Sequence, residues 1–191
     1  GYSPSIEPCP CSMKIDKKLV AKCGYLVVRE NRQKPTGNKV KIPFVYARRP
    51  EQDSTKNFIL YTTGGPGYST IGVGDSLRFA SERFMFGGFI FFDQRGSKNA
   101  KPCLDCPEID LAIKKSYQQN VSKDSLVAIA VKKCRKNLVA QGIDISAYNT
   151  IESAADINDL KEVLHLEALT LLGISYSGGL MLTVARNHPK G

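Results

Sequence analysis

The stretch from residue 169 to residue 179 constrains the fold of this chain more than any other part of its sequence. The apolar run 169–172 ends at Gly173, and a helical pattern of apolar residues follows at 180–187. This order predicts a strand that turns sharply into a helix, with Ser175 at the apex of the turn. A serine held in that position presents its hydroxyl at the end of a strand.

The flanking residues of such a turn are restricted. The turn is strained, so the residues two positions before and after the serine must not crowd its backbone. Gly173 meets this condition, whereas Ser177 stands where a second glycine is usual. An ordinary strand-to-helix loop, in which the serine has no chemical role, is the alternative interpretation.

Composition is that of a globular domain. The 191 residues are 42% hydrophobic and 24% charged, which is enough for a buried core. The formal net charge is +9, but the basic residues are scattered along the chain, which favours a solvated basic surface over nucleic-acid binding. We therefore expect no nucleic-acid partner. No apolar run approaches the length of a membrane span, so we also expect no membrane span.

The six cysteines fall into two groups, at 9–23 and 103–134. An even number so arranged predicts disulfides, and hence a secreted or periplasmic protein. We expect Cys23 to pair with Cys9 or Cys11, and Cys134 to pair with Cys103 or Cys106. The start at Gly1 rather than Met is consistent with a removed signal peptide. The pair 103/106 lacks a second pair at zinc-site spacing, so we expect no metal and no cofactor.

The remaining patterns predict alternating strands and helices. Residues 1–22 read as an extended N-terminal arm, and a strand hairpin with its loop at 31–38 follows. Buried strands are expected at 57–63 and 88–92, and helical spacing occurs at 75–84. The other expected helices cover 124–141 and 151–164, the latter with Thr150 as its N-cap. This order indicates an α/β fold with a mostly parallel sheet.

Three polar or glycine-rich segments follow expected strands: Gly64–Gly67, Asp93–Gly96 and Ser175. Ligands of parallel sheets bind beyond the carboxyl ends of the strands, so these segments should meet at one site. Asp93 and Arg95 could brace their loop as a charge-assisted pair.

A serine at the apex suits acyl transfer, which needs a nucleophile and donors for the oxyanion. Ser175 is the candidate nucleophile. The backbone N–H of Tyr176, the next residue, is one candidate oxyanion donor, and the N–H of Gly65 is the other, with Gly64 next in preference. The alternative for these glycines is a tight turn that needs them only for its dihedral angles.

Five segments occur in a characteristic order: Cys23–Asn31, Gly64–Gly67, Asp93–Gly96, Ile143–Thr150 with the helix at Ala155–Asp156, and Gly173–Tyr176. Together they resemble the prolyl/tripeptidyl aminopeptidase family of serine α/β-hydrolases. The resemblance implies an α/β-hydrolase fold, of which residues 23–191 would be the N-terminal half, lacking the C-terminal strands and lid. It also implies a Ser-Asp-His triad that hydrolyses peptides from a free N-terminus. Thr63 and Ser177 depart from the family, which usually has His or Gln and Gly there.

The triad base and acid are expected outside this chain. In this fold the acid and then the histidine follow the serine, and only His188 does so here. Twelve helical residues would place His188 roughly 18 Å from the turn. His165 precedes the strand and should lie at its opposite end.

We therefore expect the chain to be inactive alone, with the missing half or a companion chain covering the edge of the Ser175 strand. The alternatives are an esterase of the same fold and a non-catalytic interaction module on a hydrolase scaffold.

Overall fold

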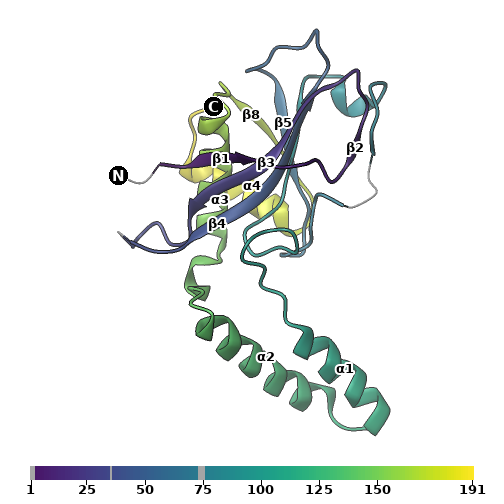
Figure 1. The fold of residues 1–191 in the computed structure, drawn as a ribbon, viewed down its shortest axis with the longest axis vertical. Helices are drawn as coiled ribbons and strands as arrows, with labels where there is room; N and C mark the ends of the chain where they lie inside the picture. The colour runs from purple at the N-terminus through teal and green to yellow at the C-terminus, as the bar shows by residue number, and fades with distance from the viewer. Residues whose placement is uncertain (1–2, 35, 73–75) are drawn as a thin grey trace.

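A six-stranded mixed sheet forms the centre of the molecule (Figure 1). The computed structural model describes residues 3–34, 36–72 and 76–191. The strands of the sheet lie in the order β1 (Ser5–Pro8), β3 (Val20–Arg29), β4 (Lys39–Arg48), β7 (Phe89–Phe92), β5 (Phe58–Thr62) and β8 (Leu169–Gly173). A second, two-stranded sheet pairs β2 (Lys14–Ile15) with β6 (Ser76–Leu77).

Strand direction divides the main sheet into two parts. β1, β3, β4 and β7 pair antiparallel with one another in turn, whereas β5 lies parallel to both β7 and β8. The sheet is thus mixed, and its three antiparallel pairs distinguish it from the mostly parallel sheet expected from the sequence. The parallel part brings the carboxyl ends of β7, β5 and β8 to one edge, where the three candidate segments follow.

The N-terminal hairpin is formed by β3 and β4, ten residues each, joined at the expected loop. The N–H of Glu30 donates to the carbonyl oxygen of Asn38 at the start of this loop, in which Pro35 lies outside the described residues. Residues 5–8 of the expected arm form β1, which pairs with β3.

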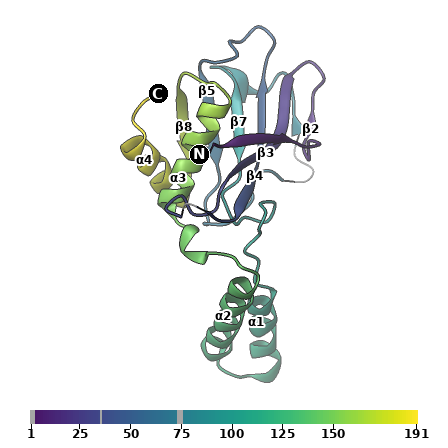
Figure 2. The ribbon, with the colours of Figure 1, turned by 60° about the vertical axis from the view of Figure 1, so that its left-hand side comes forward.

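Two helices cover one face of the sheet (Figure 2). They are α3 (Thr150–Val163) and α4 (Tyr176–Asn187). Their buried side chains pack on the sheet in one core cluster, which includes Ile157, Leu160, Leu180, Val184 and the strand residues Leu60, Ile90 and Phe92. The cap of α3 is Asn149, whose side chain accepts the N–H of Glu152, and not Thr150 as expected.

The opposite face is covered by smaller elements. Residues of β2, β6 and the 3₁₀ helix η1 (Glu82–Phe84) pack there, with Phe84 and Leu77 buried against Phe89 and Phe91. The helix expected over 75–84 is therefore wrong for the described residues 76–84. Its first residue, Asp75, lies outside the described part of the chain.

A helical hairpin extends away from the sheet in both views (Figures 1 and 2). It consists of α1 (Pro107–Gln119) and α2 (Lys123–Ala140). α2 matches the helix expected at 124–141, whereas α1 was not expected. A short 3₁₀ helix, η2 (Ile145–Ala147), leads from the hairpin into α3.

Two disulfides agree with the pairings expected from the sequence. Cys11 is bonded to Cys23, and Cys106 is bonded to Cys134. The first ties the N-terminal segment to β3, and the second ties α1 to α2. Cys9 and Cys103 are free thiols.

β8 occupies one edge of the main sheet. Within the described residues, β5 is its only strand partner. Leu172 is 42% exposed and Ile174, which follows the strand, is 59% exposed. Among the residues that the structure describes, nothing pairs with the outer side of β8, and this edge beside the candidate nucleophile is apolar.

None of the helices in the described part of the chain combines the length and the apolar character that a membrane crossing requires.

Candidate active site

Ser175 lies between the end of β8 and the start of α4. Its backbone has φ 59° and ψ −129°, a conformation that L-residues seldom adopt. Such a conformation costs on the order of 1–3 kcal/mol and persists only where neighbouring contacts enforce it. The sharp strand-to-helix turn expected from the sequence is therefore present, with Ser175 at its apex.

The side chain of Ser177 fixes this turn. Its Oγ accepts the N–H of Ile174 at 2.8 Å and donates to the carbonyl oxygen of Ile174 at 2.9 Å. Ser177 is completely buried. A Cβ at position 173 would lie 2.6 Å from the carbonyl oxygen of Ser177, which explains the need for Gly173. The departure from glycine at position 177 thus supplies two hydrogen bonds across the turn.

Replacing Ser177 by alanine should lower the free energy of unfolding by about 1–3 kcal/mol, because it leaves the partly buried N–H of Ile174 unpaired. Urea unfolding of the 191-residue chain measures this change. Thr183→Ala is the matched control, since it removes a hydroxyl whose hydrogen bond to the carbonyl oxygen of Gly179, on the same helix, is solvent-exposed. A Ser177→Ala variant as stable as this control would contradict the assignment.

The glycine loop after β5 lies directly against Ser175. A Cβ at Gly64 would lie 2.9 Å from the Cβ of Ser175, 3.2 Å from its Oγ and 3.0 Å from the carbonyl oxygen of Ile174. Gly65 has a φ of +121°, which side chains rarely tolerate. The structure therefore brings Gly64 against Ser175, and a side chain at position 64 would collide with the serine.

Asp93 and Gln94, at the end of β7, hold the glycine loop in place. The amide of Gln94 donates to the carbonyl oxygen of Thr63 at 2.8 Å. The carboxylate of Asp93 accepts the N–H groups of Thr70 at 2.6 Å and Ile71 at 3.1 Å. Burial raises the pKa of Asp93, and these hydrogen bonds oppose the rise. Both residues therefore support the segment that borders Ser175.

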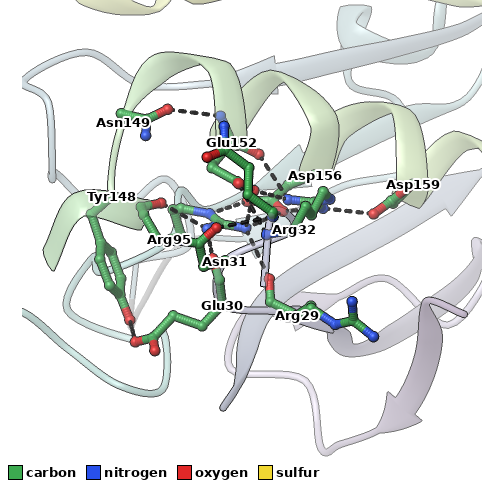
Figure 3. A network of polar contacts seen from close by, with 12 residues as sticks. Arg29, Glu30, Asn31, Arg32, Arg95, Tyr148, Asn149, Glu152, Asp156 and Asp159 are labelled. Carbon is green, nitrogen blue, oxygen red and sulfur yellow. Dashed lines mark hydrogen bonds and ion pairs between the residues drawn. The ribbon is translucent and has the colours of Figure 1, made fainter. Parts of the chain in front are cut away.

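Arg95 has a different partner from the one expected. Its Nε and Nη2 each donate to a carboxylate oxygen of Asp156 at 2.7 Å, and both side chains are 1% exposed (Figure 3). Its Nη1 donates to the carbonyl oxygens of Glu30 and Ala147, at 2.6 and 2.8 Å. The predicted pairing of Asp93 with Arg95 is wrong, because each group is satisfied by a separate set of neighbours.

Arg32 extends this network on α3. Its guanidinium contacts Asp156 at 2.7 Å and Asp159 at 2.6 Å, and it also pairs with Glu152 (Figure 3). Together the two arginines join the ends of β3 and β7 to the first turns of α3. Close by, the hydroxyls of Thr150 and Tyr176 lie 2.8 Å apart. The network therefore fixes the helix that contacts the residue after Ser175.

A cavity of about 500 Å³ opens beside these elements. The residues that border it on the side of the turn and the glycine loop are Tyr176, Pro66 and Gly67. Tyr148, Leu104 and Asp105 form part of the remaining wall. A space of this size accommodates a side chain or two of a peptide, so the site combines a serine with a neighbouring recess.

The two histidines lie away from this cavity. His188 directly follows α4 and borders a separate recess with Leu169, the first residue of β8. His165 borders another recess with Ile6 and Pro8 of β1. His188 thus lies at the far end of α4 from Ser175, as expected from the sequence, and His165 precedes β8.

Comparison with known proteins adds one relationship. No protein-family model matches the chain. Serine protease Hip1 from Mycobacterium bovis, and the same protein from the CDC 1551 and H37Rv strains of Mycobacterium tuberculosis, are 26% identical to it over 206 residues. The match covers 97% of this chain. The chain is related to a serine protease. It spans 37% of the length of these relatives, somewhat more than a third.

Proposed function

We propose that this chain is the N-terminal part of a serine protease with an α/β-hydrolase fold, and that Ser175 is its nucleophile. The observation that carries the proposal is the contact between the Gly64 backbone and Ser175 at the apex of a strained turn. This approach supports a role in acyl transfer, because a donor on the glycine loop would then lie near the carbonyl oxygen of a substrate attacked by Ser175. The relationship to a serine protease supports it independently.

In the proposed reaction, the hydroxyl oxygen of Ser175 attacks the carbonyl carbon of the substrate. The backbone N–H groups of Tyr176 and Gly65 stabilise the negative charge that develops on the carbonyl oxygen. The leaving amine departs, and water later hydrolyses the acyl-enzyme. The proton of Ser175 needs a base, and neither His165 nor His188 borders the cavity beside it.

The base and the acid of the triad are therefore proposed to come from outside this chain, either from a C-terminal half or from a companion chain. The exposed edge of β8 supports this arrangement, since an apolar strand edge is normally paired or covered. Leu182, on the neighbouring helix α4, is 74% exposed and would be covered with it. Alone, the 191 residues should show no appreciable triad-dependent turnover.

The proposed substrate class is peptides with a free N-terminus, on the basis of the family resemblance in five ordered segments. An exported location is proposed with it, because two disulfides are consistent with an oxidising compartment. The interaction-module alternative has lost part of its support, since Ser177 stabilises the turn rather than disrupting it.

Two assays on the full-length protein test the proposal. A fluorophosphonate probe should label the protein, with the adduct located on Ser175 by mass spectrometry. Peptide amides with a free N-terminus should be cleaved, while the same peptides with an acetylated N-terminus should not. Equal cleavage of both, or of simple esters only, would replace the aminopeptidase assignment by an endopeptidase or an esterase. Absence of labelling would favour the non-catalytic module.

A further inference from the structure

Two of the six cysteines have no disulfide partner in the structure, Cys9 and Cys103. Both are partly buried, and both border the same cavity of about 500 Å³. The cavity lies between the N-terminal segment and the loop after β7, and its other walls include Tyr25 of β3 and Pro43 of β4. The two thiols that remain after the other four have paired therefore face a common space.

The backbone around both cysteines is fixed against the same hairpin. The N–H of Cys9 donates to the carbonyl oxygen of Cys23 in β3 at 3.2 Å. Two residues before Cys103, Lys101 exchanges two backbone hydrogen bonds with Lys41 of β4, at 2.8 and 2.9 Å. Cys103 itself forms an isolated bridge with Gly96. Both segments are thus held by backbone hydrogen bonds to strands of the same hairpin, on either side of the shared cavity.

We propose that Cys9 and Cys103 form a third disulfide bond. A small-molecule disulfide, such as oxidised glutathione, is the oxidant. One protein thiolate attacks it, forms a mixed disulfide and releases one small thiol; the second protein thiolate then attacks the mixed disulfide and releases the other. The two protein sulfurs are oxidised, and the two electrons and two protons leave with the two small-molecule thiols.

This bond would act on the candidate active site as well as on the N-terminal segment. Cys103 borders the cavity beside Tyr176 in addition to the one that it shares with Cys9. A link to Cys9 would anchor one wall of the candidate substrate recess to the N-terminal segment, which the Cys11–Cys23 bond already ties to β3. It would also close a long loop, which restricts the unfolded chain strongly.

Peptide mapping of the folded full-length protein tests the inference, and its readout is independent of catalytic activity. The protein is equilibrated with oxidised glutathione, its remaining thiols are blocked with iodoacetamide, and it is digested without reductant. We expect the peptides that carry Cys9 and Cys103 to be joined as a pair within a larger cluster held by the other two disulfides. Fragmentation should place one bond between Cys9 and Cys103, and reduction should separate the peptides. In Cys9→Ser the pair should be absent and Cys103 should carry glutathione or the alkyl group, and Cys103→Ser should expose Cys9 in the same way. Alkylation or glutathionylation of both cysteines in the unmodified sequence, or a link from Cys9 to Cys11 or Cys23, would overturn it.

Discussion

Replacing Ser175 by alanine is expected to abolish fluorophosphonate labelling of the full-length protein and to lower its kcat for peptide hydrolysis by roughly a millionfold. The reason is that no other hydroxyl in the described turn can take over the attack. Ser177 is completely buried, and its oxygen is already bonded to both backbone groups of Ile174. Rates measured with a peptide amide at saturating concentration would give the change in kcat directly.

The matched control for this experiment is Ser125→Ala, which removes an exposed hydroxyl on α2 that donates to the hydroxyl of Ser122, the N-cap of the same helix. Labelling and turnover should be unchanged in that variant. A Ser175→Ala protein that still labels at wild-type rate would place the nucleophile elsewhere. A small residual rate above that of the uncatalysed reaction would not, since oxyanion donors and substrate binding act without the nucleophile.

The local part of the site could be predicted from sequence. The strand, the turn and the helix around Ser175 are each specified by residues within a few positions of one another. Their pattern can therefore be recognised without any knowledge of the fold. The glycine loop could be matched to this turn because both follow strands of the parallel part of the sheet. An inference from the order of strands is less certain than one from a local pattern, but it requires only the order of strands and helices along the chain.

The polar contacts could not be predicted in the same way. Arg95 and Asp156 are separated by 61 positions, and nothing near either residue indicates the other. Asp93 lies two positions from Arg95 and is the expected partner. In the structure the two side chains, both after the end of β7, bond to different neighbours. The role of Ser177 is equally hidden in the sequence, although a serine in place of glycine at a crowded position is itself a signal that its hydroxyl forms hydrogen bonds.

Helix α1 was missed for a different reason. Pro107 stands at its first turn and acidic residues follow at Glu108 and Asp110, both of which are typical of a helix start. On sequence alone, Pro102 and the cysteines at 103 and 106 favour a loop in this part of the chain. α1 packs mainly against α2, and Ser116 is its buried residue. A helix with so little buried surface has a weak apolar pattern in its sequence.

Replacing Asp156 by alanine should produce the largest loss of stability among these variants, about 3–5 kcal/mol in the free energy of unfolding. The change leaves the guanidinium of Arg95 buried without its bidentate partner, and it removes one of the carboxylates that face Arg32. Urea unfolding measures the loss. Lys34→Gln is the control, because it breaks an ion pair with Asp144 in which Lys34 is 58% exposed, and such pairs contribute about 0–1 kcal/mol.

The double variant Arg95→Met/Asp156→Leu removes both charges. Its free energy of unfolding distinguishes the contribution of the ion pair from that of the other hydrogen bonds in the network. Buried ion pairs can often be replaced by apolar residues without loss. Here the guanidinium also donates to the carbonyl oxygens of Glu30 and Ala147, which the double variant would leave unpaired. We therefore expect the double variant to recover only part of the stability lost in Asp156→Ala. Full recovery would show that the carbonyl contacts contribute little, and that apolar packing can replace the pair of Arg95 and Asp156.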